Sequence, residues 1–239
     1  MVSVTFITYV IISLVIPTRA MSPNHLLQRS LSNSFFALRH GQSLANVAKI
    51  ISSDPKISTV EHGLSDVGKE QAKAAGEGFA IDYLAKNHDY EGVAIYSSDF
   101  TRARETAEIF CEELKKKGIT IHQNGIILET RLRERYFGEL NGGSDNRYQD
   151  VWDIDMTDAN HNEFGVESAN SVLDRTSRLI CELDDVLQQT GQRWKCVVVA
   201  HGDVLQILQT GVLRHEDASR HRSLQHLETA TIRELKLGK

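Results

Sequence analysis

Residues 35–46 read FFALRHGQSLAN, and this stretch decides the fold. Four apolar residues run into Arg39, His40 and a glycine, and Ser43 and Asn46 follow shortly after. The pattern predicts a buried strand that ends in a polar loop, and such loops bind ligands in open α/β sheets. An arginine fork suits phosphate, and a neutral imidazole nitrogen attacks phosphorus without first losing a proton. On its own, a histidine in such a turn is more often structural than functional.

Three later segments add charged side chains in a similar setting. YSSDFTRARETA predicts a strand end followed by a helix that opens near Arg102. TRLRERYFGEL places Glu134 between arginines, and VVVAHGD repeats the opening theme with a second histidine, His201. Because the carboxyl ends of parallel strands meet at one edge of a sheet, we expect these side chains to form one cluster.

The alternation of strands and helices predicts an α/β fold. Such a chain forms a three-layer sandwich, with a mainly parallel central sheet and helices on both faces. Apolar runs predict strands at 35–38, 93–96, 126–128 and 196–200, with a terminal strand within 229–237. Helical patterns cover 65–86, 101–117 and 168–189, a further helix opens at 203–210, and a short one lies near 147–152. Residues 54–63 are expected to form a polar loop.

The motifs resemble those of the histidine phosphatase superfamily, specifically its phosphoglycerate mutase-like branch. The matching pieces are LRHGQSLAN, GLSDVGKEQA, YSSDFTRARETA, LRERYFGELNG and VVVAHGD, which follow one another between Phe35 and Asp203. The resemblance implies the phosphoglycerate mutase-like fold and a phosphohistidine mechanism. It implies that no metal ion or other cofactor is needed, because arginines and histidines supply the positive charge.

The same resemblance assigns the catalytic roles. His40 would be the nucleophile, and Glu134 would protonate the leaving alkoxide and then act as base for water. The phosphoryl oxygens would be held by Arg39, Arg102 and His201.

Four more residues are candidates for substrate binding: Ser43, Asn46, Arg135 and Gly202. Ser43 either contacts phosphate or caps the following helix. Arg135 either binds a second anionic group of the substrate or pairs with a neighbouring glutamate. Asp203 is expected to cap a helix. The remaining histidines have no motif context and are expected at the surface: His25, His62, His88, His122, His161, His215, His221 and His226.

The segment after Gly138 bears on the reaction type. In phosphoglycerate mutases, cations and a proline-rich stretch after the glutamate motif close over the substrate. Here the segment contains Arg147 as its one cation among eight acids from Glu139 to Glu167, and it contains no proline. We therefore expect hydrolysis of a small phosphorylated metabolite rather than mutase activity dependent on 2,3-bisphosphoglycerate. A catalytically weak interaction protein of the same fold is the alternative of another class.

The length, composition and charge of the chain limit its domain size and its partners. A chain of 239 residues with 41% hydrophobic residues can bury one substantial core. A net charge of −5 gives no general attraction for nucleic acid. Three cysteines, Cys111, Cys181 and Cys196, lack metal-ligand spacing and are expected to be small packing residues. Nothing in the sequence fixes the oligomeric state.

The N-terminal region is expected to be separate from the catalytic domain. We assign residues 1–33 to a leader or dispensable extension and residues 34–239 to the domain. Residues 4–16 are almost entirely apolar, and Ala20 would suit a signal-peptide cleavage site, although no positive segment comes first. An organelle leader is a second interpretation. Translation from Met21, which would give a cytoplasmic protein, is a third.

Overall fold

A computed structural model describes residues 22–86 and 89–238. Its centre is a five-stranded sheet in the order β3-β2-β4-β1-β5. The first four strands in sequence are mutually parallel, and β5 pairs antiparallel with β1 at one edge. The strands are β1 Ser34–Arg39, β2 Gly92–Ser97, β3 Ile121–Leu128, β4 Trp194–Ala200 and β5 Ile232–Glu234. The predicted α/β fold with a mainly parallel sheet is confirmed.

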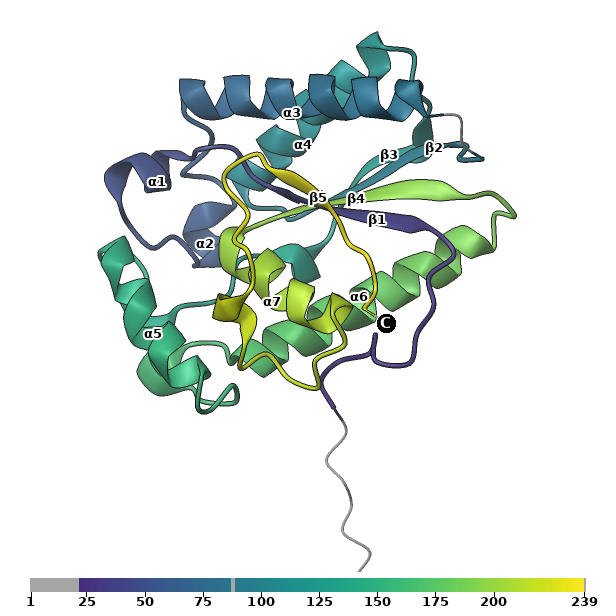
Figure 1. Cartoon of the computed structure of the whole chain (residues 1–239). Coiled ribbons are helices and arrows are strands. Elements are labelled where there is room, and N and C mark those ends of the chain that lie inside the picture. Colours follow the sequence, from purple (N-terminus) through teal and green to yellow (C-terminus); the bar gives the residue numbers. More distant parts are fainter. Residues whose placement is uncertain (1–21, 87–88, 239) are drawn as a thin grey trace, which may run out of the picture.

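Helices cover both faces of this sheet (Figure 1). The long pair α3 and α4 packs on one face, and α6 and α7 pack on the other. The α-helices are α1 Leu44–Ala48, α2 Pro55–Ser58, α3 Asp66–Ala85, α4 Thr101–Lys116, α5 Tyr148–Asp155, α6 Ala169–Gln188 and α7 Gly202–Val212. Short 3-10 turns occupy Thr130–Leu132, Gly138–Leu140, Asp145–Arg147, Glu163–Gly165 and His221–Ser223.

The core follows the two-residue alternation of the central strands. In β4, Cys196 and Val198 pack among residues of α6 and α7, whereas Val197 and Val199 pack among residues of α3 and α4. Both faces of this strand are buried, which explains why its residues 196–200 form an unbroken apolar run rather than an alternating one. The packing of both faces fixes the register of the strands, and therefore the position of the loops at their carboxyl ends.

Sequence patterns placed most elements correctly, including the short helix near 147–152, but missed the helix α2 and the start of β3. Ser65 caps α3 as expected, since its hydroxyl accepts a hydrogen bond from the backbone N–H of Gly68 at 3.1 Å. The predicted loop 54–63 contains the helix α2, which Asp54 caps and Pro55 begins. The strand β3 begins five residues before the predicted start at Ile126, with a bulge in its pairing to β2.

The described part of the predicted extension, residues 22–33, packs against the domain. Leu26 is fully buried, and the side-chain amide of Asn24 donates to the carbonyl of Gly211 in α7 at 3.0 Å. Asn33 donates to the carboxylate of Asp184 in α6 at 2.9 Å. The apolar segment 4–16 and its proposed cleavage site lie outside the described residues. No described helix is both long and apolar enough to cross a membrane.

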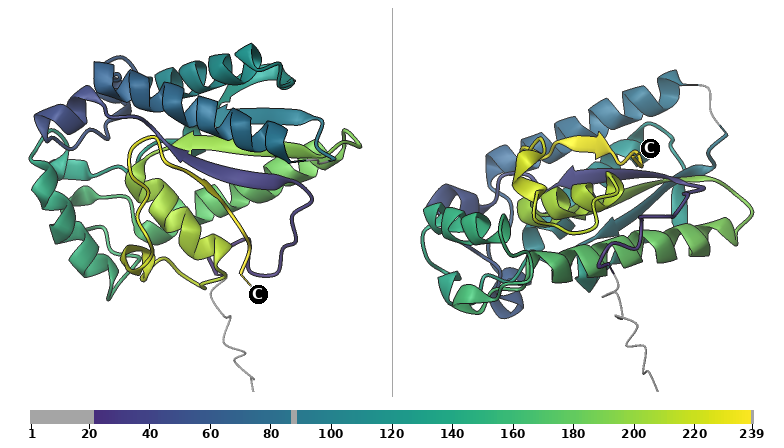
Figure 2. Two further views of the ribbon diagram at one scale, coloured as in Figure 1. Left: turned by 45° about the horizontal axis from the view of Figure 1, so that its top comes forward. Right: turned by 60° about the horizontal axis from the view of Figure 1, so that its bottom comes forward.

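The C-terminal segment returns to the edge of the sheet. The turned views show it passing beside β1 before the chain ends (Figure 2). Its strand β5 pairs Ile232 with Leu38, so the expected terminal strand exists but spans three residues. Cys111 and Cys196 are buried and Cys181 is half-buried, all as free thiols, in agreement with their predicted role in packing.

Candidate active site

The parallel strands place the motifs that follow them at one edge of the sheet. β1 and β4 are adjacent with Arg39 opposite Ala200, so the histidines that follow each strand become neighbours. The ring centroids of His40 and His201 lie 5.2 Å apart. A cavity of about 380 Å³ opens there, and its walls include Arg39, His40, Arg102 and Glu134. The structure thus brings the predicted catalytic residues together.

His40 is oriented by its own loop. Its Nδ1 lies 2.7 Å from the carbonyl oxygen of Gly41, which can only accept a hydrogen bond. The ring proton therefore sits on Nδ1, and Nε2 keeps its lone pair. Burial, together with the charges of Arg102 and Arg39, holds the pKa of His40 well below its usual value. The imidazole is thus neutral and presents a nucleophilic nitrogen.

Close backbone contact between two glycines positions this loop. A Cβ atom on Gly41 would lie 2.4 Å from the carbonyl oxygen of Gly68 in the first turn of α3. A Cβ atom on Gly68 would lie 2.0 Å from the carbonyl oxygen of Gln42. Both distances are far below van der Waals contact. The GLSDVG segment therefore serves the site indirectly, by allowing α3 to pack directly on the loop that carries His40.

Unpartnered donors surround His40. Nε of Arg39, Nη1 of Arg102 and Nδ1 of His201 are buried and have no hydrogen-bond partner among the described residues. Arg102 also donates its Nε–H to Nε2 of His40 at 3.2 Å, and another of its nitrogens donates to the carbonyl of Ser52 at 2.9 Å. Buried donors without partners are costly, so their gathering at one place indicates a site for an anion.

His201 contributes as a neutral donor. Burial, then the charge of Arg102, lowers its pKa well below the usual value. Its Nε2 lies 2.9 Å from Oγ of Ser98, and that oxygen accepts from the backbone N–H of Phe100. Ser98 can therefore donate its own proton to Nε2, which leaves the ring proton of His201 on Nδ1. The positive charge of this anion site then comes from Arg39 and Arg102.

Glu134 has the properties of a proton donor. Burial and the nearby charge of Asp203 raise its pKa to about 7, although Arg102 and Arg39 oppose the shift. One of its oxygens accepts a hydrogen bond from the backbone N–H of Arg135 at 3.0 Å, which orients the carboxyl group. A carboxyl group with a pKa near neutrality can both give and take a proton at physiological pH.

The predicted substrate-binding residues divide into two groups. Ser43, Asn46 and Gly202 line the cavity. Ser43 caps α1, because its hydroxyl accepts from the backbone N–H of Asn46 and donates to the side-chain oxygen of Asn46. Gly202 lies against the guanidinium of Arg39, where a Cβ atom would come within 3.2 Å.

Arg135 lies outside the cavity walls. Its guanidinium is fully buried and makes two hydrogen bonds to Asp155, at 2.6 and 2.9 Å, with a longer contact of 3.3 Å to Asp203. The structure therefore gives Arg135 an ion-pairing role, but its partners are these aspartates and neither neighbouring glutamate. Sequence spacing could not reveal a partner twenty residues away.

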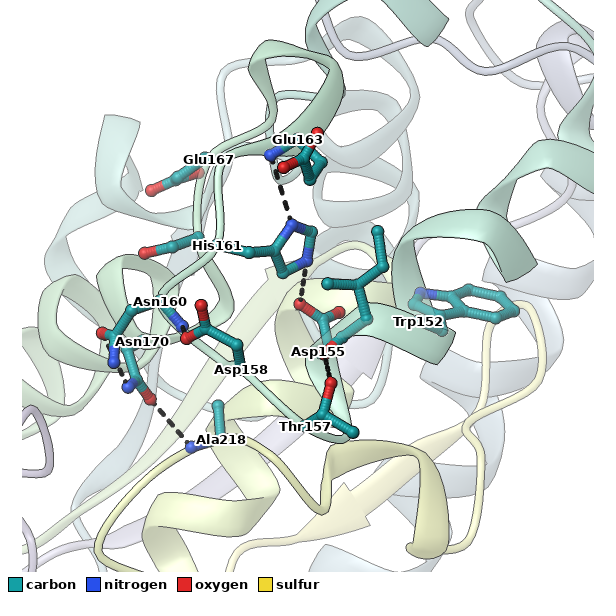
Figure 3. Close-up of polar contacts among 12 residues, drawn as sticks. Trp152, Asp155, Thr157, Asp158, Asn160, His161, Glu163, Glu167, Asn170 and Ala218 are labelled. Carbon is teal, nitrogen blue, oxygen red and sulfur yellow. Dashed lines mark hydrogen bonds and ion pairs between the residues drawn. The ribbon is translucent and has the colours of Figure 1, made fainter.

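Asp155 is the centre of a buried polar network. Figure 3 shows His161 pointing at its carboxylate, at a distance of 2.9 Å, and His221 approaches the other oxygen at 3.1 Å. Burial opposes the ionisation of Asp155, but hydrogen bonds from His221 and Arg135 outweigh it and lower its pKa. The network ties α5, the loop after α7 and the segment that carries Glu134 into one unit.

Two expectations about acids and histidines were wrong. Asp203 does not cap α7; it accepts hydrogen bonds from the indole of Trp152 at 2.9 Å and from Arg135. Of the histidines expected at the surface, His122, His161 and His221 are buried. His161 and His221 both contact the carboxylate of Asp155, and His122 packs against the ring of Trp194. His226 lines the cavity and contacts Arg39 at 2.7 Å, and His88 lies outside the described residues.

The cavity residues that sequence analysis did not assign to the site include Tyr148, Trp152, Arg222 and His226. The first two belong to α5, and the last two to the loop after α7. None stands in a strand-end motif, so no local signal marked them. Within the described ranges, no group of three or more His, Cys, Asp or Glu side chains is arranged to hold a metal ion.

Comparison with known proteins agrees with this geometry. The family model of the histidine phosphatase superfamily (branch 1) matches residues 35–239. The chain therefore belongs to the histidine phosphatase superfamily.

Individual relatives include phosphatases. A glucosyl-3-phosphoglycerate phosphatase from Mycolicibacterium vanbaalenii is 31% identical over 188 residues, which cover 74% of this chain and 72% of the relative. A metal-independent phosphoserine phosphatase from Arabidopsis thaliana is 28% identical over 198 residues, covering 77% and 70%. Phosphoglycerate mutases also occur among the relatives. The solved structure of a mycobacterial glucosyl-3-phosphoglycerate phosphatase with VO3 shares the fold, with a TM-score of 0.65 and 24% identity over 85% of this chain and 90% of that one.

Proposed function

We propose that this protein is a phosphomonoester hydrolase that works through a phosphohistidine at His40 and acts on a small phosphorylated metabolite. One observation carries the proposal. The hydrogen bond from Nδ1 of His40 to the Gly41 carbonyl leaves Nε2 as the unprotonated ring nitrogen, beside Arg102 and among unpartnered buried donors. That arrangement suits a nucleophile facing a phosphoryl group. The phosphatases among the relatives support the same reaction class.

The first step forms the phosphoenzyme. Nε2 of His40 attacks phosphorus, the bond between phosphorus and the ester oxygen breaks, and its electron pair stays on the leaving oxygen. The carboxyl group of Glu134 gives its proton to that oxygen, so an alcohol leaves. Arg39, Arg102 and His201 hold the three remaining oxygens, where negative charge is spread in the transition state.

The second step releases phosphate. Glu134, now a carboxylate, takes a proton from a water molecule as the water oxygen attacks phosphorus. The bond from phosphorus to Nε2 breaks, its electron pair returns to the imidazole, and Glu134 is again protonated. Proton and charge balance over the cycle. All of these groups belong to the chain itself.

The test is a phosphate-release assay on a panel of phosphomonoesters in the presence of EDTA. We expect release by the wild type and none by His40→Ala. His215→Ala is the matched control, because this half-buried histidine follows the far end of α7 and has no side-chain hydrogen bond among the described residues. Full activity of His40→Ala would overturn the proposal. The panel includes 3-phosphoglycerate with 2,3-bisphosphoglycerate, and isomerisation without phosphate release would identify a mutase instead.

A further inference from the structure

Arg222 is the third arginine of the cavity, and the reaction described above does not use it. It belongs to the 3-10 turn His221–Ser223, which the loop after α7 brings to the cavity wall. The sequence predicts Arg135 as a candidate partner for a second anionic group, but its guanidinium pairs with Asp155 and does not line the cavity. The fold supplies such a cation from a different segment.

The guanidinium of Arg222 is held in place by an aromatic ring. Its central carbon lies 3.6 Å from the centroid of the Trp152 ring, which in turn stacks with Tyr148 at 5.4 Å and an angle of 8°. The indole N–H of Trp152 donates to Asp203 at 2.9 Å, so the ring itself is fixed. A cation seated on a fixed ring loses little further freedom when it binds an anion.

No carboxylate neutralises Arg222. Within the described residues it forms no hydrogen bond or ion pair, and its Nη1 is buried. Asp203 is close enough to interact electrostatically, but one of its oxygens accepts from Trp152 and the other from Arg135. Burial lowers the pKa of Arg222, and the charge of Asp203 only partly offsets this. A buried donor of this kind is costly unless an acceptor reaches it.

The leaving group of the proposed reaction lies on the side away from His40, because the attacking nitrogen and the leaving oxygen lie roughly in line on opposite sides of phosphorus. Glu134, which would protonate the leaving oxygen, and Arg222 line the same cavity, and both lie within electrostatic range of Asp203. Arg222 is half-buried and also lies within electrostatic range of Arg39. The volume of about 380 Å³ is in the range of small-molecule sites.

We propose that Arg222, seated on Trp152, binds a second anionic group, a carboxylate or phosphate, on the leaving group of the substrate. The proposal rests on the phosphatase function above and narrows its substrate class to monoesters whose alcohol carries a negative charge. Arg222 is then a specificity-determining residue, and the substrate is held by cations at both ends.

The experiment measures competitive inhibition of p-nitrophenyl phosphate hydrolysis. Two pairs of inhibitors each differ in the second group alone: 3-phosphoglycerate against glycerol 3-phosphate, and propane-1,3-diol bisphosphate against its monophosphate. In the wild type we expect that, in at least one pair, the inhibitor with the second anionic group has an inhibition constant about tenfold lower, or more, than the inhibitor without it. The pair that shows the preference distinguishes a carboxylate from a phosphate.

The variant Arg222→Met should bring the ratio of the two inhibition constants within that pair to about one. The variant Arg222→Lys should retain part of the preference. Arg147→Met is the matched control and should keep the wild-type ratio. Arg147 likewise lies over an aromatic ring, that of Phe164 at 5.5 Å, but it pairs with Asp150 and does not line the cavity. Thermal unfolding of each variant confirms that the fold is intact.

The outcomes separate the two proposals. Failure of the wild type to hydrolyse p-nitrophenyl phosphate counts against the phosphatase function itself. Hydrolysis with a ratio near one for both pairs, or a ratio that Arg222→Met leaves unchanged, overturns the second-anion site and leaves the phosphatase function standing. An equal loss of affinity for both members of a pair would assign Arg222 to the phosphoryl group.

Discussion

Arg102 donates its Nε–H to Nε2 of His40 across 3.2 Å, and this contact joins residues 62 positions apart in the sequence. The same guanidinium has a buried Nη1 without a partner among the described residues. Arg102 therefore contacts Nε2 of His40 and also keeps a donor that can bind a phosphoryl oxygen in the proposed reaction. The proposed nucleophile and this cation are fixed relative to each other before the substrate binds, which lowers the reorganisation needed during the reaction.

The role of Glu134 predicts a dependence on the leaving group. Glu134→Gln should lower kcat/KM for alkyl phosphates by about 10²- to 10⁴-fold, since an alkoxide needs a proton in order to leave. Aryl phosphates leave as stable phenolates and should lose much less in the phosphorylation step. Rates of phosphoenzyme formation on matched alkyl and aryl esters measure this. Equal losses on both would contradict the general-acid role.

Asp203 should set the pH range of the enzyme. Burial of Glu134, and secondly the negative charge of Asp203, raise the pKa of Glu134 to about 7. Hydrolysis of alkyl esters should therefore decline as the pH rises through 7, because Glu134 loses the proton that it donates. Asp203→Asn removes that charge, lowers the pKa of Glu134 and moves the decline to lower pH. The pH profile of kcat/KM measures the shift. Asp145→Asn, at another wall of the cavity, is the control and should leave the profile in place.

The sequence predicted the grouping of the strand-end residues but not the part of the cavity wall formed by Trp152 and Arg222. Arg39, His40 and His201 follow apolar strands, and strand ends in a parallel sheet meet at one edge, so their grouping could be predicted. Trp152 and Arg222 come from separate segments joined by a contact of 3.6 Å, and nothing in their local sequence encodes that distance.

The same reason explains the buried histidines. His161 and His221 bind one carboxylate, that of Asp155, although sixty residues separate them. Lone polar residues in irregular segments look like surface residues when only their neighbours in sequence are considered. For Arg135, the sequence leaves open a second anionic group of the substrate or a neighbouring glutamate, because its actual partners, Asp155 and Asp203, are brought to it by the fold.

The network around Asp155 should be a main determinant of stability. Asp155→Ala leaves Arg135 charged and fully buried without its principal partner, and we expect the free energy of unfolding to fall by about 3–5 kcal/mol. Asp153→Ala is the control, since this exposed neighbour on α5 contacts only Gln149 among the described residues. Denaturant titrations of both variants measure the difference. A loss below about 1 kcal/mol for Asp155→Ala would contradict this reading of the network.

Residues 22–33 should behave as part of the folded domain rather than as a dispensable extension. A protein that begins at Ser34 loses the buried side chain of Leu26 and the hydrogen bonds of Asn24 and Asn33, so its melting temperature should fall clearly. A protein that begins at Ser22 keeps these contacts and serves as the reference. Identical melting curves for the two would show that the segment contributes nothing to stability.

The central claim is that the phosphoryl group passes through Nε2 of His40. The most direct measurement reacts Glu134→Gln with an aryl phosphate, because that variant lacks the base that activates water and should accumulate the intermediate. We predict an acid-labile, base-stable phosphate on the peptide that contains His40, and none when His40→Ala is added to the same background. Phosphate on another residue, or hydrolysis at the wild-type rate without any phosphoenzyme, would contradict the account.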